Sequence, residues 1–548
     1  MKNIKYIKLF AMFLAVLLAF MTAGCSEEKE LTVSTASASY NVKPEISNNA
    51  NESENRLTIS YASWDIDKYM ASAGTDEVFK TISQKLNIEI KPIGLTYDNY
   101  AQKIQMWAAS RQLPDIFSID AVGTQSYRNW IDQGIIKPLP VNLNKYPNLQ
   151  KYLDTTDIKE LQENGRYYCI PRKNYPSLDY NAVDRLVEYR WDLAKTAGIT
   201  KEPETWEEFK AMLKAIVEKD PEGKSIAGFS CANIKQISGF FWLYSNPAAA
   251  SDGSGTDYKW IKEGGRFIPA VFSQNALPSL ENMRDMGNQG LLDEGMSLTK
   301  GDQGYDKFAD GKIAALLHGG GYTTTNQKIL IDRWKRINPN KNYSDCVKVL
   351  KPLKNQNGDA YHAAFKTYWS ESYFNSSMPD EKLDRILKLY NFLVSEEGHD
   401  FLRYGIEGVD YEKEGNRYNI LLDPKTSVTD KYKAMPVFKE MAEWDQGFPY
   451  DNPEVPILDT EIRQAAVDYM KYIKQNTKTP EFVIKLTYLS TPAKDKFSIL
   501  DYEDLLRVLL SKEPVAEAWN GILDEYRERG LEQVIEQVNE KVKETGIN

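Results

Sequence analysis

The sequence predicts an α/β protein that folds into two lobes or more, and three observations support this. The chain has 548 residues, which is more than one hydrophobic core usually organises. Its first globular segment alternates short strand patterns with helical patterns, which is typical of a parallel sheet. Later segments repeat apolar residues at helical spacing, which indicates amphipathic helices packed on further core.

The alternation begins at residue 57. Residues 57–61 alternate apolar and polar side chains as a strand does, and residues 88–90 and 115–119 predict two more strands. Helical patterns near residues 78–86 and 100–110 separate them. Strands joined by helices in this way form a parallel sheet with right-handed crossovers. The carboxyl ends of its strands then meet at one edge, where ligands bind.

Three chemically useful side chains follow the ends of these strands. Trp64 and Asp65 come after the first strand, and Asp120 comes after the third. We therefore expect an aromatic ring and two carboxylates in one crevice at the edge of the sheet.

Farther along the chain the helices are clearer. Thr205 and Glu208 form a capping box at the start of one helix. Apolar stripes follow it at residues 206–217 and recur at 383–393 and 531–538. We interpret these stripes as core packing, because one apolar face in every helical turn is what burial requires.

The N-terminus predicts export. Lysines at positions 2, 5 and 8 precede an apolar run from Leu9 to Met21, which is too short to span a bilayer and suits a signal peptide. The run ends in Thr22-Ala23-Gly24-Cys25, which resembles the lipobox of bacterial lipoproteins. Residues 1–24 are therefore predicted to be removed and Cys25 to be lipidated, although an ordinary secretory signal that happens to carry a cysteine stays open.

The segment after Cys25 predicts a tether. Ser, Asn, Glu, Thr and Ala dominate residues 26–55, so little apolar surface is available for a core. A flexible chain of this length spans about 30 Å. Two acyl chains on Cys25 would anchor it stably to the membrane.

Charge and cysteine content exclude several classes of protein. The formal net charge is −10, and loss of the three lysines of the signal peptide makes it −13. No basic run is present, so nucleic acid is not an expected partner. Four cysteines cannot form a disulfide scaffold. Cys169, Cys231 and Cys346 are predicted to be buried free thiols.

No motif predicts catalysis, a metal or a cofactor. The chain lacks the His-Glu-x-x-His zinc motif, a Gly-x-Gly-x-x-Gly helix start, a P-loop and a calcium loop. Residues 318–321 (His-Gly-Gly-Gly) resemble an esterase oxyanion loop, but the chain has no Gly-x-Ser-x-Gly elbow, so we interpret them as a turn. A pair of carboxylates at glycosidase spacing stays open.

Aromatic side chains outside the helical stripes are the more informative feature. They are Trp64, Trp130, Trp242, Tyr322, Trp369 and Trp444. A sugar ring stacks its apolar face on such rings and needs charged or amide partners for its hydroxyls, and Trp64 beside Asp65 supplies both. For each ring taken alone, core packing is an equal alternative.

Several segments in order resemble one family, the extracellular solute-binding proteins of ABC importers, and in particular its large lipoprotein branch. Leu113-Pro114-Asp115-Ile116-Phe117 resembles the family's Pro-Asp-Ile strand, and Gly134 to Leu139 the turn after it. The further matches are Gly165 to Pro171, with Cys169 where glycine is usual, Arg190 to Phe209, Phe308 to Ala315 and Tyr404 to Tyr411. Together they span nearly the whole mature chain.

The resemblance implies an α/β, two-lobed periplasmic-binding-protein-like fold of type II, with a ligand cleft between lobes joined by crossover strands. Lobe 1 would comprise residues 56–170 and about 358–405, and lobe 2 about 171–357 and 406–548. Hinges would lie near Ile170-Pro171 and Ala363 to Phe365. By similarity to the maltose-binding branch, ligand contacts would be Trp64, Asp65, Asp120, Arg172, Trp242, Tyr322 and Trp369.

The function implied is that of a receptor, with no catalytic residue, no metal and no cofactor. It would be a monomer, lipid-anchored on the extracellular face of the cell membrane, that captures an oligosaccharide and delivers it to the permease subunits of an ABC importer. Two alternatives stay open. One is a surface-anchored glycan-degrading hydrolase or lyase, and the other is a peptide-binding receptor.

Overall fold

The computed structural model describes most of the chain from residue 56 onward. The described ranges are 56–96, 99–183, 185–239, 258–299, 303–319, 325–364, 366–415, 417–423, 426–444, 460–499 and 501–547. The predicted signal peptide, Cys25, the predicted tether, Trp242, Tyr322 and Phe365 lie outside them. Within these ranges, no helix has both the length and the apolar character needed to cross a membrane.

The first lobe is built on a five-stranded sheet with the order β2-β1-β3-β11-β4. Its strands are β1 (Leu57–Trp64), β2 (Ile88–Leu95), β3 (Ile116–Ile119), β4 (Cys169–Lys173) and β11 (Tyr368–Phe374). Strand β1 pairs in parallel with both β2 and β3, which confirms the predicted β-α-β pattern. Strand β11 runs antiparallel between β3 and β4, so a segment from late in the chain completes the sheet.

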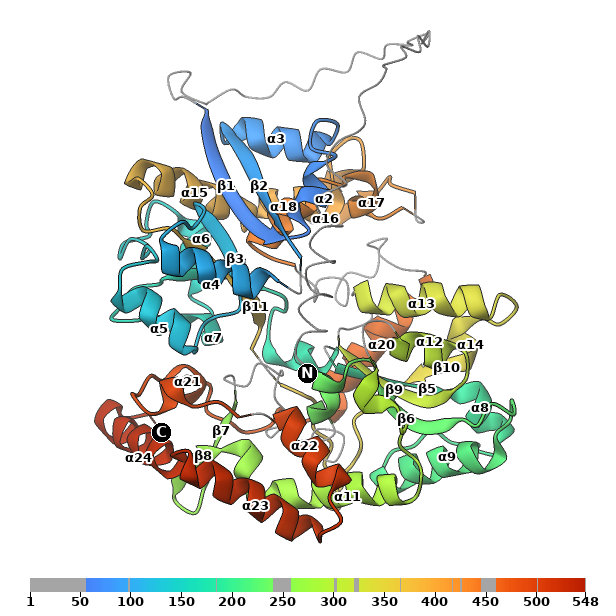
Figure 1. The fold of residues 1–548 in the computed structure, drawn as a ribbon. Coiled ribbons are helices and arrows are strands. Elements are labelled where there is room, and N and C mark those ends of the chain that lie inside the picture. Colours follow the sequence, from blue (N-terminus) through green and yellow to red (C-terminus); the bar gives the residue numbers. More distant parts are fainter. Residues whose placement is uncertain are drawn as a thin grey trace, which may run out of the picture. The chain divides into compact units, whose positions relative to one another are not determined.

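Helices pack around this sheet, and Figure 1 shows α3, α4 and α15 beside β1, β2 and β3. Their bounds are α2 (Ile66–Met70), α3 (Glu77–Lys85), α4 (Tyr100–Ser110), α5 (Gln125–Asp132), α6 (Pro147–Leu153), α7 (Thr156–Lys159), α15 (Asp380–Leu393) and α16 (Glu396–Tyr404). The predicted stripe on α15 is buried in the core of this lobe, which confirms its interpretation as core packing.

The sequence-based boundary of the first lobe differs from the structure. Helices α17 (Val428–Lys431) and α18 (Pro436–Met441) follow residue 405, yet their buried side chains belong to the first core. Phe438 stacks on Phe79 with ring centroids 5.1 Å apart. The buried carboxylate of Asp76 accepts from Phe79 N at 2.8 Å, capping α3, and also from Ala434 N at 2.7 Å. One side chain thus fixes both segments to lobe 1.

The second lobe is built on a four-stranded sheet with the order β10-β5-β9-β6. Its strands are β5 (Arg185–Arg190), β6 (Ala227–Cys231), β9 (Ile313–Gly319) and β10 (Val347–Val349). Strand β6 is parallel to β9, and β5 is antiparallel to both β9 and β10. A separate hairpin consists of β7 (Trp260–Glu263) and β8 (Arg266–Pro269). The first lobe has a hairpin of its own, in which β12 (Tyr411–Glu414) pairs with β13 (Arg417–Ile420).

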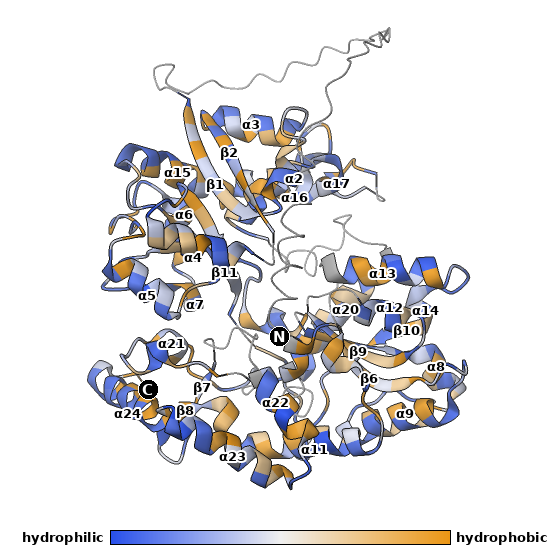
Figure 2. Ribbon diagram, in the orientation of Figure 1, coloured by the Kyte–Doolittle hydropathy of each residue, from blue (hydrophilic) through white to orange (hydrophobic). Residues whose placement is uncertain are grey.

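Helices supply most of the second core. They are α8 (Trp191–Thr196), α9 (Trp206–Lys219), α11 (Leu277–Asn288), α12 (Gln303–Ala309), α13 (Thr325–Ile337), α14 (Tyr343–Cys346), α20 (Thr460–Asn476), α21 (Ile484–Tyr488), α22 (Asp501–Leu510), α23 (Val515–Glu528) and α24 (Leu531–Thr545). The capping box of Thr205 and Glu208 is present at α9. Hydrophobic and hydrophilic residues alternate along α9, α11 and α23 in Figure 2, and the apolar faces of α9 and α24 are buried as predicted.

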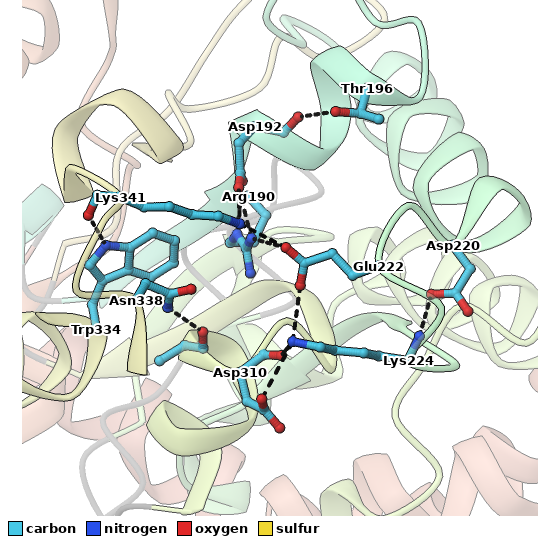
Figure 3. A network of polar contacts seen from close by, with 11 residues as sticks. Arg190, Asp192, Thr196, Asp220, Glu222, Lys224, Asp310, Trp334, Asn338 and Lys341 are labelled. Carbon is cyan, nitrogen blue, oxygen red and sulfur yellow. Dashed lines mark hydrogen bonds and ion pairs between the residues drawn. The ribbon is translucent and has the colours of Figure 1, made fainter. Parts of the chain in front are cut away.

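A network of ion pairs and hydrogen bonds surrounds Arg190, the last residue of β5 in the second sheet (Figure 3). The buried guanidinium of Arg190 donates to both carboxylate oxygens of Asp192 at 2.8 Å and to Glu222 at 3.3 Å. Lys341 and Lys224 also contact Glu222, at 2.8 and 3.1 Å. Glu222 therefore links β5, the turn after α9 and the segment after α13, and Arg190 adds α8 through Asp192.

The three cysteines of the described residues are free and buried, as predicted. Burial raises the pKa of the Cys169 and Cys231 thiols. They therefore stay protonated and unreactive.

Candidate functional site

Four aromatic side chains from distant parts of the chain meet beside the carboxyl end of β1. We call Trp64, Tyr100, Trp369 and Trp444 the aromatic cluster. The ring centroids of Trp64 lie 5.1 Å from Tyr100 and 5.2 Å from Trp369, and Trp369 lies 5.4 Å from Trp444. Trp64 is almost buried, whereas the other three rings are half-buried. Part of the surface of Tyr100, Trp369 and Trp444 is therefore accessible to solvent.

Trp64 and Asp65 stand where the strand pattern predicts. Trp64 is the last residue of β1 and pairs in register with Leu95. Asp65 then leaves the strand with a φ of 55° while its N–H donates to Leu95 O at 3.0 Å. Its carboxylate forms an ion pair with Lys68 at 2.6 Å and is 41% exposed. The turn therefore places an accessible carboxylate next to the buried indole.

Trp369 comes from an irregular part of β11. The pairing of β11 with β4 shifts register between Tyr368 and Glu371. Ser370 has a φ of 59°, a left-handed conformation that is uncommon outside glycine. Such a bulge re-aims the side chains of a strand, and Trp369 is half-buried between the buried Tyr368 and Ser370.

Arg172 lies under three rings of the cluster. Its guanidinium carbon is 3.9 Å from the ring centroid of Trp444, 4.8 Å from Trp64 and 5.4 Å from Trp369. The side chain is 1% exposed and forms an ion pair with Glu440, which is 7% exposed. Burial raises the pKa of Glu440, although the charge of Arg172 opposes this. The positive charge is thus enclosed by protein groups.

A second group of charges lies at the carboxyl end of β3. Asp120 forms an ion pair with Lys366 Nζ at 2.8 Å. The buried carboxylate of Glu371 accepts from Ala121 N at 3.0 Å and from the Tyr373 hydroxyl at 2.8 Å. Burial, together with the charge of Asp120, raises the pKa of Glu371 to about 7. Glu371 is two residues from Trp369 on β11, so this group borders the aromatic cluster along the strand.

The structure brings together Trp64, Asp65, Arg172 and Trp369, and it places Asp120 directly after β3, the strand that pairs with β1. Trp242 and Tyr322, the other two predicted contacts, lie outside the described residues. Trp130, grouped in the sequence with the loop aromatics, is instead a core residue of α5 and packs edge-on to Phe117.

Four residues at or beside the site were not found from the sequence: Tyr100, Glu440, Lys366 and Glu371. Tyr100 is the first residue of α4, the helix after β2, and the sequence predicts this position only as part of a helix. Glu440 precedes Trp444 by four residues and accepts a hydrogen bond from the Trp444 indole N–H at 3.0 Å. A carboxylate at helical spacing before a loop tryptophan is the signal that could have identified it.

The site is chemically suited to binding. Among the residues that the structure describes, no group of three or more His, Cys, Asp or Glu side chains could hold a metal ion. The arrangement offers ring faces for apolar contact. It also offers the exposed Asp65 carboxylate and the Asp120–Lys366 pair for hydrogen bonding.

Comparisons with known proteins agree with this picture. The family model described as bacterial extracellular solute-binding protein matches residues 67–398. The polygalacturonan/rhamnogalacturonan-binding protein YtcQ of Bacillus subtilis (strain 168) is 22% identical over 361 residues, which cover 64% of this chain and 66% of YtcQ. Lipoprotein LipO of the same organism is 20% identical and covers 66% of this chain and 68% of its own length. The chain thus spans about two thirds of the length of these relatives.

The fold is also found among solved structures. An EF-hand mutant of FusA, an ABC-transporter substrate binding protein of S. pneumoniae in complex with fructo-nystose, superimposes with a TM-score of 0.66. The match covers 89% of this chain and 99% of FusA at 16% sequence identity. This likeness confirms the predicted α/β periplasmic-binding-protein-like fold.

Proposed function

Because the chain belongs to the bacterial extracellular solute-binding protein family, and is therefore a binding protein rather than an enzyme, we propose that it is the receptor that captures an oligosaccharide for an ABC importer. The aromatic cluster is the observation that carries this proposal. Neighbouring rings of the cluster are tilted by 39–67°, and the half-buried ones offer apolar surface on which the C–H face of a sugar ring stacks.

The polar groups beside the rings suit the hydroxyls of a sugar. The carboxylate of Asp65 is accessible, and Asp120 with Lys366 offers an acceptor next to a donor. Hydrogen bonds to charged partners are the stronger ones. A ring face bordered by such groups therefore both holds a saccharide and fixes its orientation.

The charges favour a neutral saccharide over an acidic one. Arg172 is paired with Glu440, Lys366 with Asp120 and Lys68 with Asp65. An anionic ligand would have to compete with a carboxylate for either lysine, and the enclosed Arg172 offers it no contact. The formal net charge of −13 without the signal peptide opposes it further. YtcQ is named for binding polygalacturonan, so acidic oligomers belong in the test.

Lipid anchoring is the second part of the proposal. The mature chain would begin at Cys25, carry acyl chains on that thiol and remain on the extracellular face of the cell membrane. The lipobox-like Thr22-Ala23-Gly24-Cys25 supports this, as does the name of the relative LipO. From there the receptor, as a monomer, would pass its ligand to the permease subunits.

A panel of oligosaccharides in a thermal-shift assay tests the function. Transport receptors must release their ligand, so we expect a Kd of about 1 μM. Free ligand at a hundred times that Kd then stabilises the fold by about 2.7 kcal/mol, which raises the Tm by about 5–10 °C. Neutral oligosaccharides should give this shift, and oligogalacturonates should not.

Two further measurements on the same samples distinguish the receptor from a glycan-degrading enzyme and from a peptide receptor. Chromatography of the saccharide after incubation should show it unchanged, because a receptor returns its ligand intact. A peptide mixture run in parallel should give no shift. A shift with peptides alone would remove the carbohydrate assignment and leave the family membership in place.

A further inference from the structure

We propose that Arg172 and Glu440 form a positioning pair, which holds Trp64, Trp369 and Trp444 in the arrangement that the ligand meets. The inference rests on the proposed function, because it assigns a role within that same site. The pair would act through the rings and would not itself touch the ligand.

The first support is the enclosure of the guanidinium. Its central carbon lies within 5.4 Å of all three indole ring centroids. A cation over an indole face is attracted most strongly when both are shielded from water, and Arg172 is 1% exposed. Only a flat, delocalised cation can stack on several rings at once, so lysine is not an equivalent residue here.

The second support is the backbone around Trp369. Arg172 Nε donates to the Trp369 carbonyl oxygen at 3.3 Å, and Nη2 donates to Ser370 Oγ at 2.6 Å. These are the two residues of the β11 bulge, and Ser370 is held at a φ of 59°. Such a conformation persists when surrounding contacts enforce it. Arg172 thus fixes both the ring of Trp369 and the chain that carries it.

The third support is the part played by Glu440. One of its carboxylate oxygens accepts from Arg172, and the other accepts from the Trp444 indole N–H at 3.0 Å. Its backbone carbonyl accepts from Arg172 Nη1 at 3.3 Å and from the Tyr61 hydroxyl at 3.0 Å. Glu440 therefore neutralises the arginine, orients Trp444 and connects both to β1.

The experiment compares this pair with a matched buried arginine. Arg190 is also fully buried, carries carboxylate partners and lies 4.9 Å from the ring centroid of Trp334. Both side chains are drawn in Figure 3. It belongs to the second sheet and contacts no ring of the aromatic cluster in the described structure. Arg172→Lys and Arg190→Lys therefore make the same chemical change in two comparable settings. Glu440→Gln is a second, nearly isosteric variant of the pair.

The ligand-independent reading is fluorine NMR of the protein labelled with 5-fluorotryptophan. The chain has 11 tryptophans, and single Trp→Phe variants assign their resonances. In Arg172→Lys the resonances of Trp64, Trp369 and Trp444 should shift or broaden while that of Trp334 stays in place. Arg190→Lys should show the converse. In Glu440→Gln the Trp444 resonance should move.

The ligand-dependent reading is the Kd for the best saccharide of the panel, measured by calorimetry below the Tm of each variant. Arg172→Lys should weaken binding by about tenfold or more, and Arg190→Lys should change it less than twofold. A folded Arg172→Lys or Glu440→Gln protein with the resonances of Trp64, Trp369 and Trp444 unmoved would overturn the proposal. So would moved resonances with an unchanged Kd.

Failure of the proposed function would look different. In that case the wild-type protein binds no saccharide at all, whereas the fluorine spectra still report on the three tryptophans. Unmoved spectra would then refute the positioning role, and moved spectra would support it for whichever solute the site takes.

Discussion

Trp369 joins the aromatic cluster because β11 is irregular at that point. A regular strand alternates its side chains between the two faces of the sheet, and the register shift between Tyr368 and Glu371 interrupts this alternation. The left-handed Ser370 and its hydrogen bond from Arg172 hold the bulge. The residue-level design of the site is therefore a ring on a locally distorted strand, packed on a buried cation.

Removing that ring should weaken binding strongly. Trp369→Ala deletes the half-buried indole between Trp64 and Trp444, and loss of a central aromatic anchor costs about 2 kcal/mol or more, or about 30-fold in Kd. Calorimetry with the best saccharide of the panel measures it. Trp191→Ala, at the start of α8 in the second lobe, is the control and should leave the Kd unchanged. Equal affinities for wild type and Trp369→Ala would place the ligand elsewhere.

Glu371 should make stability depend on pH. Burial, then the charge of Asp120, raises its pKa to about 7, against the opposing charge of Lys366 and the hydrogen bonds from Ala121 N and Tyr373. Since the folded-state pKa lies above the unfolded one, the folded protein binds more protons. The contribution of Glu371 to stability is thus full below about pH 4.5 and is lost as the pH rises through about 7.

Urea unfolding of wild type and Glu371→Gln between pH 5 and pH 8 measures this effect. The unfolding free energy of the variant, relative to that of the wild type, should increase with pH by on the order of 1–3 kcal/mol across the range. A difference in unfolding free energy that stays constant with pH would show that the carboxyl group does not titrate in this window.

The residues of the site differ in how far the sequence could predict them. Trp64, Asp65 and Asp120 follow strand ends, and the local alternation of side chains reveals such ends. The enclosure of Arg172 could not be predicted, because its partners lie 108, 197 and 272 positions away along the chain. Whether that arginine contacts solvent or three indoles depends on how the segments pack, which no local pattern records.

At the scale of elements, the sequence predicted the features that depend only on neighbouring residues. The capping box of Thr205 and Glu208 predicted the start of α9, and the buried stripes of α15 and α24 followed helical spacing. The position of α18 in lobe 1 was missed because it depends on Asp76, more than 350 residues earlier, whose carboxylate holds the chain at Ala434 and Met435.

The network around Arg190 joins several elements, and Glu222 is its common partner. Burial raises the pKa of Glu222, but hydrogen bonds from Lys341 and Lys224 and the charge of Arg190 outweigh it and bring the pKa to about 2. A depressed pKa means that the carboxylate stabilises the fold above about pH 4.5. That contribution is lost as the pH falls towards about 2.

Glu222→Gln should therefore lower the unfolding free energy at pH 7 by about 1 kcal/mol, since the site is partly open to solvent and screened. Denaturant titration measures it. Glu218→Gln on α9 removes the same charge from an exposed ion pair with Lys214 and should cost much less. Equal losses for the two variants would mean that the network adds nothing beyond a surface pair.

At the scale of the whole molecule, the proposed anchor makes a prediction about location. Lipidation requires the thiol of Cys25, so Cys25→Ala should release the folded protein into the medium, where immunoblotting of cell and medium fractions detects it. Cys346→Ala, which removes a buried thiol of the second lobe, should remain with the cells. A Cys25→Ala protein that stays wholly membrane-bound would refute the lipid anchor.

Motion between the two sheets depends on the chain segments that join them. Ile170 and Pro171, expected to be hinge residues, lie inside the first sheet, where they pair with Ser372 and Glu371. A rotation that preserves this pairing must therefore take place in the chain segments that leave the sheet.

Two such segments are the connections after β4 and before β11, which contact each other. The N–H groups of Asn174 and Tyr175 donate to Thr367 O at 2.9 and 3.1 Å, and Asn181 Nδ2 donates to Lys366 O at 3.2 Å. Two crossing connections held together in this way can twist as one, which is the geometry of a hinge. Lys366 lies in the connection before β11 and pairs with Asp120, so a ligand that contacts Asp120 would act directly on that connection.

Saturating saccharide should therefore close the protein and lower its radius of gyration, as measured by small-angle scattering. Lys366→Met removes the ion pair between hinge and site while keeping the length of the side chain, and should reduce the change on binding. Lys348→Met, at a surface ion pair with Glu202 in the second lobe, is the control and should close like the wild type. A radius that is the same with and without bound saccharide would mean that the site is rigid, and that the connections after β4 and before β11 serve only to join the lobes.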